Sequence, residues 1–226
     1  MIEKLVPQDV ACADTYEADA PPGSLYPQEA ELVAKSVERR RQEFAAVRAC
    51  ARRAMAGLGL PPAPVLRGHR GMPLWPEGTV GSMTHCDGYR AAVLARASEV
   101  RGIGIDAEPN EPLPPGVWDV ISLPSERKRT PEGANGTAVH WGRLLFSAKE
   151  SVFKTWFPLT RIELDFSEAD ISFDGIPDGT PGNATEGTFT AELLRTAPGM
   201  PGSYTGRWLV DGGLVVTAIV LRPGED

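Results

Sequence analysis

Apolar residues in the first half of the chain follow helix spacing and then strand spacing. Residues 1–26 contain short apolar pieces that predict one strand and a loop. Steps of three and four residues then predict a helix over residues 27–58, with a break near Ser36. Short apolar runs around an Asp-Gly turn signal predict three antiparallel strands, at residues 80–86, at 89–96 and in the run ending at Asp106. These strands would bring His85 and Asp106 into one sheet.

In the second half of the chain, a predicted helix is followed by several predicted strands. A broad apolar stripe predicts a helix over residues 138–157 that ends at Pro158. The charged segment 124–138 before it contains Gly and Pro and is predicted to be a mobile loop. Apolar runs after it predict four strands, at residues 162–174, 189–194, 203–210 and 214–221. Because each half offers helix and antiparallel strands, the predicted class is α+β.

Length and composition restrict the class of protein. The 226 residues suffice for one large or two small domains, and a hydrophobic content of 42% is enough for a core. No apolar run approaches the roughly 18 residues of a membrane span, and the first residues lack the pattern of a signal peptide. The three cysteines are odd in number and widely spaced, which favours reduced thiols. We therefore expect a cytoplasmic protein without a membrane partner.

The charge of the chain is unevenly distributed. A net charge of −7 argues against a nucleic-acid-binding protein, which would usually be basic. Several arginines nevertheless lie close together on the first predicted helix, at Arg39, Arg40, Arg41, Arg48, Arg52 and Arg53. They could form a solvated helix face. They could equally form a clamp for phosphate groups, which planar guanidinium groups bind well.

Two short segments carry candidate chemistry. In the segment 102–108, an apolar run ends in Asp106 and Glu108, which would project from the same face of a strand. Two adjacent carboxylates repel each other unless a cation or proton lies between them, and Mg²⁺ is commonly held by carboxylates and substrate phosphates. The segment 146–154 adds Glu150 between two lysines, which suit phosphates as point charges. Together the segments indicate a magnesium–pyrophosphate site.

Each segment alone also has an ordinary structural interpretation. Asp106 and Glu108 could simply end a strand before a loop. Glu150 and Lys154 could form a solvated i, i+4 pair. Ser147 and Glu150 also fit the capping box S-x-x-E at the start of a helix.

The two segments together resemble the signature of the 4′-phosphopantetheinyl transferases. The chain contains G-I-D-x-E at 104–108 and, some forty residues later, F-S-x-K-E-S-x-x-K at 146–154. The match is to the single-chain branch, similar to enterobactin synthetase component D, and is closest to actinobacterial members. Further stretches fit, including R-R-x-x-E-F at residues 39–44, after which Val47 stands at a position that is often glycine in the family.

The resemblance implies a fold of two similar α/β subdomains related by a pseudo-twofold axis. It places the N-terminal subdomain at residues 1–105 and the C-terminal subdomain at 106–226, with the active site at their junction. A monomer would suffice for this arrangement.

The resemblance also implies roles for individual residues. The metal ligands would be Asp106, Glu108 and Glu150, and the catalytic residues Glu150, Lys154 and Asp106. The residues that bind coenzyme A would be Arg40, Arg48, Arg67, Thr84, His85, Lys149 and Lys154. Arg70 is the alternative to Arg67, and Ser82 is a lesser candidate.

The implied reaction moves 4′-phosphopantetheine from coenzyme A to a serine of an apo acyl or peptidyl carrier protein, with Mg²⁺ as cofactor. It would release adenosine 3′,5′-bisphosphate and activate fatty-acid, polyketide or nonribosomal-peptide synthases, including those for siderophores. Two alternatives belong to other classes. A magnesium-dependent nucleotide phosphohydrolase would turn over without a protein acceptor, and a non-catalytic coenzyme A-binding module would bind coenzyme A without needing Glu150.

Overall fold

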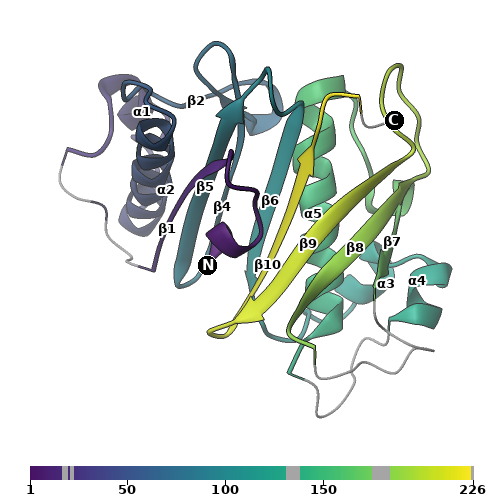
Figure 1. Ribbon diagram of the computed structural model, residues 1–226. Helices are drawn as coiled ribbons and strands as arrows, with labels where there is room; N and C mark the ends of the chain where they lie inside the picture. The colour runs from purple at the N-terminus through teal and green to yellow at the C-terminus, as the bar shows by residue number, and fades with distance from the viewer. Residues whose placement is uncertain (17–19, 21–22, 131–137, 175–183, 225–226) are drawn as a thin grey trace.

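The structure, a computed structural model, describes the chain except residues 17–19, 21–22, 131–137, 175–183 and 225–226. Two antiparallel sheets stand side by side, each backed by a long helix (Figure 1). Mixed helix and antiparallel strand confirm the predicted α+β class. Within the described part of the chain, no helix has the length and apolar character needed to cross a membrane.

The first sheet has three strands in the order β1-β5-β4, with bounds Ala11–Thr15, Tyr89–Arg96 and Thr79–Cys86. Helix α2, Glu38–Gly57, covers one face and buries Cys50, Ala51, Ala54 and Met55 against Ala92 and Leu94. A short helix α1, Pro27–Glu31, precedes it, so the predicted break near Ser36 is confirmed. Pro27 begins α1, where its missing N–H costs no hydrogen bond.

The second sheet has five strands in the order β6-β10-β9-β8-β7. Their bounds are Gly102–Pro109, Leu214–Leu221, Ser203–Asp211, Glu186–Leu193 and Ala169–Phe173. Helix α5, Trp141–Thr160, buries a stripe that includes Trp141, Leu144, Ala148, Val152 and Trp156 against the sheet. This stripe accounts for the strong helical periodicity of the sequence there.

Short elements connect and flank the two sheets. A 3₁₀ turn η1, Ile2–Lys4, precedes β1, and the small pair β2, Leu66–Arg67, with β3, Pro73–Leu74, encloses η2, His69–Gly71. Helices α3, Val117–Ile121, and α4, Pro124–Arg129, lie near the end of the five-stranded sheet where β7 is, and η3, Phe166–Glu168, leads into β7 (Figure 1).

The expectation that β4, β5 and β6 form one sheet is wrong. β6 pairs with β10 instead, with Asp106 opposite Thr217. β6 nevertheless lies beside β4, because two hydroxyls replace the missing ladder: Ser82 Oγ accepts from the Ile105 N–H at 3.1 Å and Thr84 Oγ1 from the Ala107 N–H at 3.1 Å. His85 and Asp106 are thus brought together across a boundary between sheets.

Three segment predictions also need correction. The first part of the predicted loop 124–138 forms α4, with Pro124 in its first turn and Glu126 at its N3 position, and residues 131–137 lie outside the described part of the chain. Pro158 does not end α5, which continues to Thr160 and ends where Arg161 takes a left-handed conformation (φ 60°). The predicted strand 162–174 is strand only from Ala169.

Gly104 allows α5 to lie directly on β6. A Cβ atom at this position would lie 2.0 Å from the Ser151 carbonyl oxygen and 2.4 Å from Thr155 Oγ1. Real Cβ atoms do not approach backbone this closely, so any side chain at Gly104 would push α5 away from the strand that carries Asp106.

We therefore expect Gly104→Ala to lower the free energy of unfolding by about 3 kcal/mol, at or above the usual range for overpacking. The matched control is Gly202→Ala, because Gly202 has negative φ and nothing within 4 Å of its added Cβ. Urea denaturation of both variants measures the difference. Equal stability of the two would contradict the close packing described for Gly104.

Candidate active site

Asp106 is the carboxylate on which the site is centred. It lies on β6 and is only 4% exposed. Its Oδ1 accepts hydrogen bonds from Lys154 Nζ of α5 at 2.7 Å and from Thr84 Oγ1 of β4 at 3.3 Å. Its Oδ2 is buried and has no hydrogen-bond partner among the described residues. A buried charged oxygen without a partner is costly, and the site therefore favours a cationic ligand there.

Two more carboxylates lie near Asp106 and respond to its charge. Burial and the charge of Asp106 raise the pKa of Glu108 to about 7, although Arg143 lies 3.1 Å from its Oε2. Burial raises the pKa of Glu150 as well; Lys154 opposes this effect and Asp106 adds to it. This mutual repulsion fits a donor set for a divalent cation, which would stabilise all three in their charged form.

Two of the three carboxylates pair with basic side chains. Lys154 forms an ion pair with Asp106, and Arg143 forms one with Glu108. Among the described residues, no three acidic, imidazole or thiol side chains lie close enough together to form a ready-made metal site. Arg143 was not predicted. It lies seven residues before Glu150 on α5, and this spacing of two helical turns is the signal that could have identified it.

A pocket next to Asp106 concentrates basic groups. Its lining includes Glu150 and the basic residues Arg40, Arg48, Arg67, Arg70, His85 and Lys154. These come from α2, from the β2–β3 segment, from β4 and from α5. Such a concentration on a chain of net charge −7 indicates a ligand with several negative charges.

Arg48 is buried by the way α1 docks on α2. Its guanidinium carbon lies 3.1 Å from the centroid of the Phe44 ring, its Nε donates to the Val65 carbonyl at 3.1 Å, and the fully buried Glu29 lies 3.7 Å away. Burial lowers the pKa of Arg48 to about 9, partly offset by Glu29. Glu29 was missed by the sequence analysis, where it could only be recognised as the N3 residue of a helix.

Arg40 and His85, which both line this pocket, contact each other. Arg40 hydrogen-bonds to His85 Nε2, and Glu43 Oε2 lies 3.3 Å from Arg40 Nη1 and 3.9 Å from His85 Nε2. Partial burial and the charge of Arg40 lower the pKa of His85 to about 4. The imidazole is therefore neutral at pH 7 and accepts the arginine N–H. Glu43 is a further residue that the sequence analysis missed.

Arg67 and Arg70 are the two alternatives for one predicted coenzyme A contact, and they differ in their surroundings. Arg70 takes a left-handed backbone conformation (φ 55°), and its side chain pairs with Glu163. Arg67 lies 5.0 Å from the Phe44 centroid, and burial with the nearby charge of Arg40 lowers its pKa. In the described chain no carboxylate pairs with Arg67. This leaves its charge more available to an incoming anion than that of Arg70.

Comparison with known proteins identifies the family. Residues 28–95 match the 4′-phosphopantetheinyl transferase N-terminal domain, and residues 102–204 match the 4′-phosphopantetheinyl transferase superfamily. The transferase Svp of Streptomyces mobaraensis is 53% identical over 92% of this chain and 83% of its own length. PptT of Mycobacterium tuberculosis is 48% identical, covering 95% of this chain and 93% of its own. Npt of Nocardia iowensis is 47% identical over 97% and 99%.

The chain belongs to the 4′-phosphopantetheinyl transferase superfamily. The predicted family and its actinobacterial branch are thereby confirmed, and so is the prediction that the protein is a phosphopantetheinyl-transferring enzyme.

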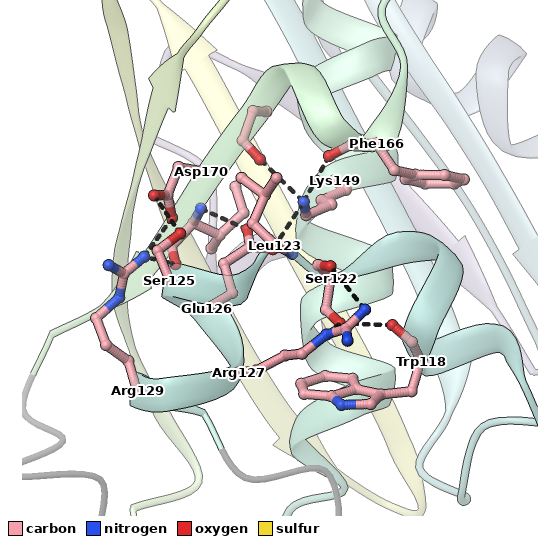
Figure 2. Close-up of polar contacts among 12 residues, drawn as sticks. Trp118, Ser122, Leu123, Ser125, Glu126, Arg127, Arg129, Lys149, Phe166 and Asp170 are labelled. Atoms are coloured by element: carbon pink, nitrogen blue, oxygen red, sulfur yellow. Dashed lines mark hydrogen bonds and ion pairs between the residues drawn. The ribbon is translucent and has the colours of Figure 1, made fainter.

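One predicted phosphate contact of this transferase needs correction. Lys149 is 3% exposed and turns away from the pocket that holds Lys154. Its ammonium lies 2.9 Å from Glu126 Oε2 and donates to the Phe166 carbonyl (Figure 2). It also donates to the Ala169 carbonyl. All three N–H groups are used, so Lys149 has none left for a phosphate. Sequence spacing could not reveal this, because Glu126 lies in a segment that was predicted to be a loop.

The neutral state of His85 predicts how stability depends on pH. The unfolded chain protonates this side chain near its ordinary pKa of 6.5, whereas the folded transferase does so only near 4. Between these values the unfolded state binds more protons, so stability falls as pH is lowered from 6.5 to 4. His85→Gln, which cannot titrate, should show a shallower fall. Urea midpoints at pH 7 and pH 4.5 measure this; identical pH dependence in both proteins would contradict the assignment.

Proposed function

We propose that this transferase moves 4′-phosphopantetheine from coenzyme A to a serine hydroxyl of apo acyl or peptidyl carrier proteins. The serine oxygen forms a bond to the phosphorus that bears pantetheine, and the pyrophosphate bridge breaks. Adenosine 3′,5′-bisphosphate leaves with the bridging oxygen. The observation that carries this proposal is the group of carboxylates around Asp106, next to a pocket lined by five cationic side chains and by His85.

Mg²⁺ fits the acidic part of the site. Asp106, Glu108 and Glu150 would hold it, and the unpartnered Oδ2 of Asp106 supports this set. When bound, the ion would supply charge neutralisation at the pyrophosphate and help to align the attacking oxygen. Lys154 and Arg143 pair with two of these carboxylates and offset part of the repulsion among them.

The basic pocket supports separate roles along coenzyme A. Arg40 and Arg48 would bind the 3′-phosphate, and His85 would donate to a phosphate from Nε2, in the form of the ring that carries a proton on that nitrogen. Arg67 would lend a further positive charge. Lys154 would face the pyrophosphate, since its Nζ is already 2.7 Å from Asp106 and 27% of its side chain is exposed. Thr84 would act through its hydrogen bond to Asp106.

Glu150 is our candidate for the group that takes the serine proton. Its raised pKa makes it a stronger base than an ordinary glutamate, and it lines the same pocket as Lys154. Because metal coordination weakens a carboxylate as a base, a water held by Glu150 is the alternative. We place the reaction at the junction of the two subdomains, in a cytoplasmic enzyme that works as a monomer.

The test of this function is the intact mass of an apo carrier protein incubated with the enzyme, coenzyme A and Mg²⁺. We expect a gain of one 4′-phosphopantetheine that EDTA abolishes and that added Mg²⁺ restores. Fatty-acid, polyketide and peptide carriers are tested in parallel, together with a carrier whose acceptor serine is alanine. Measurable coenzyme A binding without modification of any carrier would instead favour a non-catalytic module, and hydrolysis of coenzyme A without an acceptor would favour a phosphohydrolase.

Replacing Asp106 separates its chemical role from its structural role. Asp106→Asn should lower kcat/KM by about 100-fold or more, since removing a charge that holds the metal costs several kcal/mol in the transition state. Asparagine keeps an oxygen at the Oδ1 position for Lys154 and Thr84, and the lost ion pair is offset by the lost repulsion toward the other two carboxylates. The free energy of unfolding should therefore change by less than about 1 kcal/mol. Asp119→Asn, at an exposed carboxylate on α3, is the control. Wild-type turnover in Asp106→Asn would rule out this metal assignment.

A further inference from the structure

Glu126 of α4 forms a buried polar cluster on the side of α5 away from the pocket. It is 0% exposed, and both of its carboxylate oxygens accept hydrogen bonds (Figure 2). Oε1 accepts from the Ile171 N–H at 2.7 Å, and Oε2 accepts from the Leu123 N–H at 2.7 Å. Oε2 also lies 2.9 Å from Lys149 Nζ. Glu126 therefore joins the start of α4, strand β7 and helix α5.

The Lys149 ammonium completes this cluster. Besides Glu126, it donates to the Phe166 carbonyl at 2.6 Å and to the Ala169 carbonyl at 2.9 Å. The three N–H groups of the Lys149 ammonium thus each have an acceptor. Its positive charge is paired with the Glu126 carboxylate, although the Lys149 side chain is only 1% exposed. A buried ion pair of this kind contributes little net stability relative to apolar residues, while loss of one partner alone leaves an unpaired buried charge.

Helix α4 also covers the outer edge of the five-stranded sheet. β7 is the last strand in the order β6-β10-β9-β8-β7, so the outward-facing groups of Ile171 lack a strand partner. Glu126 takes the Ile171 N–H, Arg129 donates to the Ile171 carbonyl at 3.1 Å, and Ser125 donates to Asp170 at 2.7 Å. Side chains of α4 thus replace a missing strand, and α4 is held firmly to the sheet.

The cluster is connected to the site through the backbone of α5. Lys149 immediately precedes Glu150, and consecutive residues of a helix point about 100° apart. Holding Lys149 toward Glu126 and the carbonyls of η3 and β7 therefore fixes the direction of Glu150. On the sheet side, α5 is tied to β10 by Ser151 Oγ, which lies 2.6 Å from Thr217 Oγ1. Lys149, two residues before Ser151, adds a restraint on nearly the opposite side of the helix.

We propose that Lys149 is a positioning residue, and that its pair with Glu126 fixes the orientation of the α5 turn that presents Glu150 to the reacting phosphate. The inference rests on the proposed function, because it assigns Glu150 to the reaction. It gives Lys149 no contact with coenzyme A. It also makes α4, which contributes no residue to the basic pocket, part of the apparatus that sets the turnover rate.

The test compares Lys149→Met, Glu126→Gln and the double variant in three measurements. These are kcat with an apo carrier, the Kd of coenzyme A by calorimetry without carrier, and the midpoint of thermal unfolding. Each single variant should lose about 10- to 100-fold in kcat, the effect of a displacement near 1 Å. The Kd of coenzyme A should stay within about twofold, because no phosphate contact is removed.

The double variant distinguishes positioning from stability. It contains neither buried charge, so its unfolding midpoint should return toward that of the wild type. Its kcat should stay as low as in the single variants, because the tie between α4 and α5 is still missing. It also remains informative if either single variant fails to fold. Lys128→Met, at an exposed lysine of the same helix α4, is the matched control and should behave as wild type.

Three outcomes would count against this reading in different ways. Recovery of kcat together with stability in the double variant would reduce the pair to a structural role. A selectively weaker coenzyme A affinity in Lys149→Met would make Lys149 a phosphate ligand. Both outcomes overturn the inference while the wild-type enzyme still modifies its carrier. Absence of any transfer by the wild type would instead overturn the proposed function, and the inference would be lost with it.

Discussion

The contact between Asp106 and Lys154 is the interaction on which the arrangement of this transferase depends. It joins strand β6 of the five-stranded sheet to helix α5, which covers that sheet. Thr84 of β4 donates a hydrogen bond to the same carboxylate and so connects the three-stranded sheet to it. Asp106 is nearly inaccessible to water, so its hydrogen bonds are stronger than they would be at the surface. For the same reason, its unpartnered Oδ2 favours a cation beside it. The geometry of the whole junction converges on one side chain.

The basic pocket illustrates a second constraint, which is the cost of holding positive charges close together. Arg48 is desolvated, and the fully buried Glu29 and the ring of Phe44 compensate this cost. Arg40 is accompanied by Glu43 and by a neutral His85. The carboxylates keep the guanidinium groups oriented, so that a polyphosphate ligand would find them already in place. Such preorganisation reduces the entropic cost of binding.

The sequence predicted the elements well where one short-range rule decided them. The α5 stripe, the hairpin between β4 and β5 and the paired motifs around Asp106 and Glu150 all follow from local spacing. It failed where long-range partners decided the outcome. β6 joins β10, more than a hundred residues later, although β5 is its neighbour in the chain. Lys149 looked like a phosphate ligand because its partner, Glu126, could not be placed without the fold. Glu29 and Glu43 were missed for the same reason.

These long-range contacts share a physical logic. Both outer strands of the five-stranded sheet have an edge that no strand covers, and in each case side chains satisfy it. Ser82 and Thr84 accept the Ile105 and Ala107 N–H groups of β6, and Glu126 and Arg129 bind Ile171 of β7. Each set then extends toward the site, from Thr84 to Asp106 and from Glu126 to Lys149 beside Glu150. The groups that close the edges of the sheet therefore also hold the two carboxylates in place from opposite sides.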